Sequence, residues 1–555
     1  MKRRQFLSHA LKTAAVTPIL LNGLPMRAIG SGSWFKRLTN DPFENRKIVL
    51  IQMHGGNDGL NTLIPMDQYA TYQSMRNNIA IPDTGDRAYI PLDTTVPLEQ
   101  QVGLHPDLTI FKDFYDSGKM AVVQNVGFEN MNGSHFRGRD IWFMGGNYDE
   151  YKNSGWMGRY LDHEYPNYPD AYPNDDMPDP LGLEIGTQVS LGYFRNQGIP
   201  VALATNDPEN FADLITGLGG PNPNLIPNNH YGQELQHVIS LYANANNYAQ
   251  QLQDRWNAGN NNVPYPGGNF MEYPGPTNNH ESNNFAWQLQ TVARLIQGGS
   301  KTRIYLVRIG GFDTHDNQVL AGNPTHGSHA ALLYHLSTAL KAFYDDLAVS
   351  GKDQEVVAMT FSEFGRRAFS NGSHGTDHGK AFPAFVFGPG VEPGIHGNAP
   401  DLDNLESNNL PYEIDYRQMI TGVLCGWMGA DSSAIAAAEF SDYEQTKLPL
   451  IDPIYANGGT TSVGDPFNFT EMELNVYPNP ATTFIRYSVD SSKPSDATVK
   501  VYDTMGRLHL ETQIQLVTGE NDLELNIGSL TPGTYYISIV RGAENFVKSR
   551  AFLVH

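Results

Sequence analysis

Five apolar runs between residues 45 and 453 constrain the fold more than any other feature of the sequence. Each run has the length of a strand and is apolar enough to be buried on both faces, as in a parallel sheet. The runs are 47–53, 120–126, 302–309, 356–361 and 384–388. Amphipathic patterns with an apolar spacing near 3.6 residues lie between some of them and predict helices over 233–256, 284–296 and 330–347. We therefore expect one α/β domain over 45–453, with a mostly parallel sheet flanked by helices on both faces.

The segments that follow the first four runs are rich in Asp, His, Glu, Arg and Asn. Because the carboxyl ends of parallel strands meet at one edge of a sheet, these side chains are expected to converge there. The candidates, in chain order, are Asn57, Asp58, Ser134, His135, Asp313, His315, Glu363, Arg366, Asp377 and His378. Such a convergence at four strand ends predicts a functional site.

The residue types at these positions suit divalent metal ions. Imidazole nitrogen and carboxylate oxygen are zinc ligands, and carboxylates also bind calcium or magnesium, so the identity of the metal stays open among these three. Cys425 is the only cysteine, which limits the candidate ligands to His, Asp and Glu. The adjacent Asp377 and His378 need a turn to reach one ion, because neighbouring side chains of a strand point to opposite faces.

Two further candidates predict how a substrate could be attacked. Ser134 precedes an expected helix start, where backbone amides favour anions, and its hydroxyl could be a nucleophile activated by a metal. Arg366, with Arg367, could hold an oxyanion as a fork. Structural roles remain open for several residues: Asp58 in an Asx-turn, Ser134 as a helix cap, and Glu363 in an ion pair with Arg366.

The order of these motifs resembles the domain-of-unknown-function family 1501 and, more distantly, the alkaline phosphatase and sulfatase superfamily. The matching segments are 54–61, 311–315, 362–367 and 375–379. The resemblance implies an alkaline phosphatase-like fold, with Ser134 before His135 as the nearest candidate nucleophile. It also implies metal ligation by Asp58, Asp313, His315, Asp377, His378 and His396. The Asp313-x-His315 spacing is tighter than the pattern of the superfamily.

Both ends of the chain are expected to direct export. Residues 1–30 begin with Lys2, Arg3 and Arg4 before a short apolar stretch, which resembles a twin-arginine signal. Residues 473–555 contain short alternating runs bounded by turn residues, which predict a small antiparallel β-sandwich. The segments 476–480, 501–507 and 533–536 resemble the C-terminal sorting domain of type IX secretion cargo. A linker is expected over 454–472. The implied partners are the twin-arginine and type IX secretion machineries, and the implied location is the outside or the cell surface, reached through the periplasm.

The net charge of −22 argues against a nucleic-acid-binding protein, which would be basic. The sequence contains no apolar stretch long enough for a transmembrane helix. We therefore expect a secreted or surface-attached, metal-dependent hydrolase of phosphate or sulfate esters, acting on an anionic ester or polysaccharide. The alternative is a catalytically inactive surface binding or assembly protein with the same fold.

Overall fold

The computed structural model describes residues 19–21, 24–26, 42–169, 171–213, 246–267, 272–456, 475–491, 495–503, 507–517, 519–541 and 545–554. The chain divides into two compact units at residues 461 and 462, inside the stretch that the sequence predicts as a linker. Most of the predicted export signal (1–30), most of the linker (454–472) and part of the predicted helix 233–256 lie outside the described residues.

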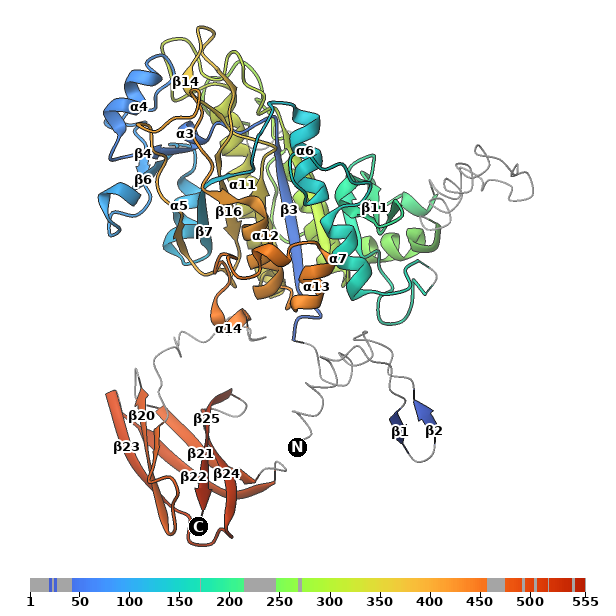
Figure 1. Cartoon of the computed structure of the whole chain (residues 1–555), viewed down its shortest axis with the longest axis vertical. Coiled ribbons are helices and arrows are strands. Elements are labelled where there is room, and N and C mark those ends of the chain that lie inside the picture. Colours follow the sequence, from blue (N-terminus) through green and yellow to red (C-terminus); the bar gives the residue numbers. More distant parts are fainter. Residues whose placement is uncertain are drawn as a thin grey trace, which may run out of the picture. The chain divides into compact units, whose positions relative to one another are not determined.

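A nine-stranded, mostly parallel sheet forms the centre of the first unit (Figure 1). Its path is β11 (Ala202–Thr205), β8 (Gly182–Ile185), β12 (Ile304–Gly310), β3 (Lys47–His54), β13 (Val356–Phe361), β16 (Phe382–Phe387), β7 (Met120–Gly127) and β17 (Gly394–His396), with β18 (Ile414–Asp415) paired to β7. The five predicted apolar runs are the five adjacent strands from β12 to β7. Only β16 runs antiparallel to its neighbours, so β3, β7, β12 and β13 all end at one edge.

Helices pack on the two faces of this sheet, and Figure 1 shows them on either side of β3. They are α5 (Thr109–Asp116), α6 (His135–Met144), α7 (Trp156–Glu164), α10 (Ala286–Gln297), α11 (Ser328–Val349), α12 (Tyr416–Gly426) and α13 (Ser432–Ala437). β3, β7, β13 and β16 are almost fully buried, as expected for central strands covered on both faces. The prediction of a mostly parallel sheet flanked by helices is therefore confirmed. Among the described residues, no helix is both long and apolar enough to span a bilayer.

Short elements surround this frame. The helical ones are α3 (Gly59–Thr62), α4 (Tyr69–Met75), α14 (Pro453–Ala456), η1 (Leu98–Gln100), η2 (Leu191–Tyr193), η4 (Lys352–Glu355) and η5 (Ser441–Tyr443). The strands are β1 (Ile19–Leu21) with β2 (Leu24–Met26), β4 (Leu63–Pro65) with β6 (Val102–Leu104) and β5 (Ile90–Pro91), β9 (Phe194–Arg195) with β10 (Ile199–Pro200), and β14 (Arg366–Ser370) with β15 (Thr376–His378). The β14–β15 pair brings part of the predicted site together.

The second unit contains two small antiparallel sheets. One orders β19 (Asn475–Tyr477), β20 (Phe484–Ser491) and β23 (Gly519–Asn526); the other orders β22 (Leu508–Leu516), β21 (Ser495–Asp503), β24 (Gly533–Arg541) and β25 (Asn545–Val554). Ile485 and Tyr487 of β20 join Val499, Val501 and Ile537 of the other sheet in one buried apolar cluster. Alternate residues of each strand supply this cluster, which is the period-2 pattern seen in the sequence.

Candidate metal centre

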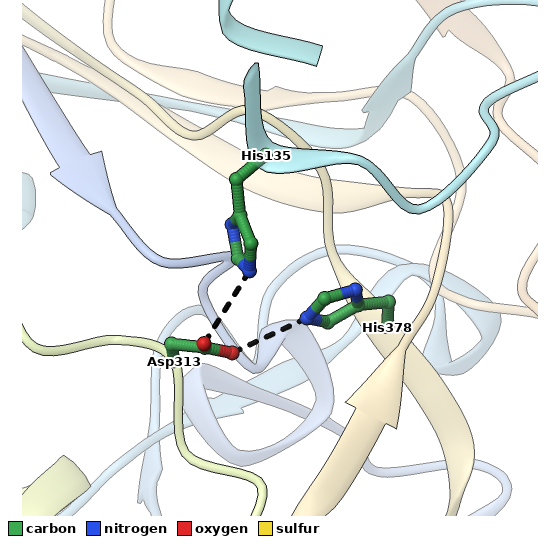
Figure 2. Close-up of side chains that lie close together, drawn as sticks. All are labelled: His135, Asp313 and His378. Carbon is green, nitrogen blue, oxygen red and sulfur yellow. Dashed lines mark hydrogen bonds and ion pairs between the residues drawn. The ribbon is translucent and has the colours of Figure 1, made fainter. Parts of the chain in front are cut away.

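Four side chains meet near the edge of the sheet where its parallel strands end. His135 is the first residue of α6, Asp313 and His315 follow β12, and His378 ends β15. Figure 2 shows the imidazoles of His135 and His378 pointing at the carboxylate of Asp313. Three separate segments of the chain thus deliver nitrogen and oxygen atoms to one place.

The distances among these atoms are short. Nε2 of His378 and Nε2 of His315 each lie 3.2 Å from Oδ1 of Asp313, and the two nitrogens are 2.8 Å apart. Nε2 of His135 lies 3.4 Å from Oδ2 of the same carboxylate. Three imidazoles therefore present the same ring nitrogen to one carboxylate.

The other ring nitrogen of each histidine faces an oxygen. Nδ1 of His378 lies 2.8 Å from the carbonyl oxygen of Gly133, and Nδ1 of His135 lies 2.7 Å from Oε1 of Glu363. Nδ1 of His315 lies 3.6 Å from Oδ1 of Asp377. In the tautomer in which Nδ1 of His378 donates to Gly133 and Nδ1 of His135 donates to Glu363, each neutral ring keeps a lone pair on Nε2 for a metal ion. Histidines that hold metals are oriented in this way.

This arrangement fits a divalent metal ion. Ligands about 2.0–2.1 Å from a tetrahedral zinc ion are separated by about 3.3 Å, close to the spacing of the Nε2 and Oδ1 atoms. His135, Asp313 and His378 offer ligand atoms that all lie within 4.8 Å of one another. Nε2 of His135 is buried and has no hydrogen-bond partner among the described residues. His315 is not one of these three residues, but its Nε2 lies 3.2 Å from Oδ1 of Asp313. A donor set of imidazoles with one carboxylate suits zinc better than calcium or magnesium, which prefer oxygen ligands.

Arg366 fixes the position of Asp313. Its buried guanidinium donates to Oδ1 of Asp313 at 2.8 Å and also to the backbone carbonyls of Gly55, Gly56, Phe312 and Thr376. Burial alone would raise the pKa of Asp313, but the hydrogen bonds from Arg366 and His378 outweigh it and lower that pKa to about 2. Asp313 is therefore a permanent anion at neutral pH.

These contacts change the interpretation of Arg366. The sequence predicts that it holds an oxyanion of the substrate, whereas the side chain is 0% exposed and its three nitrogens donate to protein oxygens. Arg366 thus ties three loops together and does not face a substrate. Arg367, at 45% exposed, is the neighbouring arginine that reaches the surface.

Glu363 orients His135. Its Oε1 accepts from the backbone N–H of Gly55 at 2.8 Å as well as from His135. The hydrogen bond with Glu363 is the largest cause of a raised pKa for His135, while burial opposes it. The predicted ion pair between Glu363 and Arg366 is replaced by this pairing with a histidine.

The structure places Asp58 outside the cluster. Its carboxylate is 0% exposed. It accepts hydrogen bonds from Nη1 of Arg76, at 2.8 Å to Oδ1 and 2.6 Å to Oδ2, and from the side-chain amide of Gln318, at 2.5 Å to Oδ2. Asn57 is equally buried, with its amide oxygen 3.0 Å from Nε2 of His329. Both residues follow β3 as predicted, but the carboxylate of Asp58 and the amide oxygen of Asn57 are occupied by other side chains. Asp58 therefore has the geometry of an ion-pair partner and not that of a ligand beside Asp313.

Three other predicted residues also lie apart from the four convergent side chains. Ser134 is the N-cap of α6, and its hydroxyl accepts the backbone N–H of Arg137 at 3.3 Å. Asp377 extends from β15 to the outer side of His315, because Asp377 and His378 lie on a strand and not on the turn that a shared ion would need. His396 pairs with Val123 in the middle of β7, away from the carboxyl end of that strand.

Two glycines permit the close approach of the loops. A Cβ atom at Gly55, where φ is 125°, would lie 2.2 Å from the backbone nitrogen of Asp313. A Cβ atom at Gly375 would lie 2.3 Å from the carbonyl oxygen of His315. Any larger residue at either position would push apart the segments that carry the histidines.

The sequence gives only a weak signal for His135. This residue follows a predicted cap residue without any spacing motif that would connect it to Asp313 or His378, so the sequence predicts it only as a residue near the site. Its pairing with Glu363 crosses 228 residues of sequence. The available signal was the placement of His135 and Glu363 after two strands that end at the same edge of the sheet.

Residues 233–432 match the family described as "Protein of unknown function (DUF1501)". Residues 475–551 match the "Secretion system C-terminal sorting domain". The family match includes Asp313, His315, Glu363 and His378 but begins after His135. The sorting domain indicates export by type IX secretion to the cell surface or the outside.

Comparison with curated proteins gives no match. Among solved structures, PorZ, a surface component of the type IX secretion system of Porphyromonas gingivalis, is 21% identical over 15% of this chain and 11% of its own, with a TM-score of 0.11. β-Glucosidase 3B from Thermotoga neapolitana is 17% identical over 15% of each chain, with a TM-score of 0.12. Ps i-CgsB, solved with k-i-k-neocarrahexaose, is 9% identical over 80% of this chain and 84% of its own, with a TM-score of 0.29. These TM-scores are too low to establish a shared fold.

Proposed function

We propose that this chain is an exported hydrolase of phosphate or sulfate esters that depends on one divalent metal ion held by His135, Asp313, His315 and His378. The observation that carries the proposal is the convergence of three Nε2 atoms on the carboxylate of Asp313, each with its Nδ1 facing an oxygen. When bound, a divalent ion supplies Lewis acidity, which polarises an ester oxygen and lowers the pKa of water.

The residues around this centre have distinct tasks in the proposed reaction. Arg366 keeps Asp313 charged and in place, and Glu363 keeps the lone pair of His135 directed at the centre. His315 and Asp377, at 45% and 51% exposed, lie on the solvent side, where a substrate enters. Water supplies the attacking oxygen, the bond between phosphorus or sulfur and the leaving oxygen breaks, and the leaving alcohol takes up a proton. Ser134 acts as a helix cap and not as the nucleophile.

Metal content and hydrolysis test this proposal together. The full exported chain is treated with a chelator, reloaded with zinc, and assayed with p-nitrophenyl phosphate and p-nitrophenyl sulfate. We expect hydrolysis of one of the two substrates to disappear on chelation and return with metal. The variant His378→Ala should lose both metal and activity, whereas His163→Ala, in which a histidine that contacts Ser433 is removed, should keep both. Absence of bound metal in the reloaded wild-type chain would contradict the proposal.

The predicted twin-arginine signal belongs to the same proposal. That route carries folded proteins, so the metal would be acquired before the chain reaches the outer membrane. Replacing Arg3 and Arg4 with lysine should leave the precursor in the cytoplasm, as judged by cell fractionation. Export of this variant at the normal rate would show that a different signal is used.

A further inference from the structure

A row of polar side chains lies beside the metal centre on one face of the sheet. Arg308 of β12 pairs in register with Gln52 of β3, and Leu306 pairs with Glu184 of β8. Paired residues of adjacent strands share a face, as do residues two apart on one strand. Glu184, Arg308, Gln52 and His54 are therefore on the same face, and His54 ends β3 close to the centre.

Helix α6 contributes His135 and Arg139 next to this row of polar side chains. His135 and Arg139 are four residues apart, which puts them on one face of the helix. The rings of His54 and His135 stack with their centroids 6.3 Å apart and their planes 19° apart. Arg308 thus shares a sheet face with His54, and Arg139 shares a helix face with His135, whose ring stacks on that of His54.

The hydrogen-bond donors here exceed the acceptors that the chain provides. Nε of Arg308 donates to Oε1 of Gln52 at 2.8 Å, but Nε2 of Gln52, in a side chain that is 0% exposed, has no partner among the described residues. Glu184 is held by Ser190 at 2.7 and 2.8 Å and lies 3.5 Å from Arg308. The carboxylate nearest to Arg139 is that of Asp140, at 4.0 Å.

We propose that Arg139, Arg308 and His54 form a subsite for a second anionic group of the substrate, in which the buried Gln52 positions Arg308. The ester cleaved at the metal centre then carries another sulfate, phosphate or carboxylate group, and this inference rests on the proposed function. A planar guanidinium binds such groups through two parallel hydrogen bonds. Arg308 and Arg139 are 39% and 30% exposed, so both are accessible to a ligand from solvent.

An exposed ring extends the subsite. Phe136, at 74% exposed, follows His135 on α6, and its ring centroid lies 5.7 Å from the guanidinium carbon of Arg139. A flat apolar surface beside two cations suits the carbon skeleton of an anionic sugar better than that of a small inorganic ion. The structure therefore favours a substrate that carries more than one charged group on a ring.

Binding to metal-free protein tests the subsite separately from the metal centre. The probe is a heparin-derived disaccharide with several sulfate groups, titrated calorimetrically into the full chain in chelator. We expect Arg139→Gln and Arg308→Gln each to raise Kd about 10-fold or more, since each removes a charge-assisted hydrogen bond. Arg308→Lys, which keeps the charge but loses the fork, should have an intermediate effect.

A matched control removes an arginine elsewhere in the chain. Arg486→Gln, in the second unit, deletes one exposed guanidinium that pairs with Glu524, and its Kd for the disaccharide should equal that of the wild type. Thermal unfolding of each variant checks that the chain is folded. If Arg308→Gln is unstable, Arg139→Gln still tests the subsite, because it removes only a partly exposed pair with Asp140. No binding of the disaccharide by the wild type, or equal Kd values in all variants, would overturn the subsite. If the proposed function fails but the subsite exists, the zinc-reloaded protein will contain no metal and will still bind the disaccharide.

Discussion

Substitutions in the buried ion pair between Asp58 and Arg76 test most directly whether Asp58 has a structural role or is a metal ligand. Substituting Arg76 with Met leaves a carboxylate that is 0% exposed without its cation. It also removes hydrogen bonds from the guanidinium to the carbonyl oxygens of Ala368 and Arg367, at 2.9 and 2.7 Å, which fasten β14. The substitution therefore removes contacts to the β14–β15 hairpin, which carries His378, and leaves the four candidate metal ligands unchanged.

The size of the effect follows from the burial of the charge. Breaking a buried ion pair by removing one partner costs about 3–5 kcal/mol, because the remaining charge is left uncompensated. Burial would raise the pKa of Asp58, yet the charge and hydrogen bonds of Arg76 and the amide of Gln318 bring it below its usual value, with a contribution from His329. We expect Arg76→Met to lower the free energy of unfolding of the first unit by about 3–5 kcal/mol. The double variant Asp58→Asn/Arg76→Met should recover part of this loss, since no buried charge remains.

Urea unfolding followed by near-ultraviolet circular dichroism measures the stability, and elemental analysis of the folded variants measures the metal. If Asp58 is an ion-pair partner, Asp58→Asn should destabilise the chain while the metal-to-protein ratio stays at the wild-type value. If Asp58 is a ligand, Asp58→Asn should lower the metal content with little change in stability. The second pattern would refute the structural assignment of Asp58.

Three other expectations concern the positioning of His135, stability in acid and export. Glu363→Gln should weaken metal binding about 10- to 100-fold in a zinc-competition titration while His135 remains present, because the carboxylate orients the ligand; an unchanged affinity would remove Glu363 from this role. Burial lowers the pKa of His329 to about 4, so the folded chain binds this proton less readily than the unfolded chain; stability is full above about pH 6.5 and falls as the pH drops toward 4, by about 2 kcal/mol at pH 5. His329→Gln should flatten this dependence in urea unfolding at pH 7 and pH 5, and an equal slope in both proteins would contradict the assignment. Deleting residues 475–551 should keep the protein in the periplasm, as detected by immunoblotting of cell fractions, whereas export of the shortened chain would show that the matched sorting domain is dispensable.

The sheet could be predicted because its signal is local. Four of the five apolar runs are almost fully buried on both faces, and burial on both faces selects continuous apolar sequence whatever the neighbours are. The reversed direction of β16 could not be predicted in the same way, since a buried strand reads alike in either direction. The reversal does not affect the site, because the strands that carry polar ends are parallel to one another.

The site could be predicted only in part, since a motif gives the place of a side chain but not its direction. Asp313, His315 and His378 converge as their positions after the strands suggested. Asp58 is equally well placed in sequence but turns toward Arg76, a residue of a separate segment that no motif connected with it. Asp377 points away from the cluster because β15 is a strand. The glycines at 375 and 379 favour a turn there, so the sequence does not predict this strand.

The two buried arginines also bear on how many metal ions the chain holds. Asp58 is a predicted metal ligand, but in this chain the guanidinium of Arg76 supplies the positive charge beside it. Arg366 does the same for one side of Asp313. Arg76 donates to both oxygens of Asp58 and Gln318 donates to Oδ2, so these N–H groups fill the directions that metal ligation of Asp58 would need, whereas Arg366 donates to Oδ1 of Asp313 only. We therefore expect one metal ion per chain, held by the three histidines and Asp313. A ratio of two in the zinc-reloaded protein would mean that Arg76 moves aside, and Asp58→Asn should then lower that ratio to one.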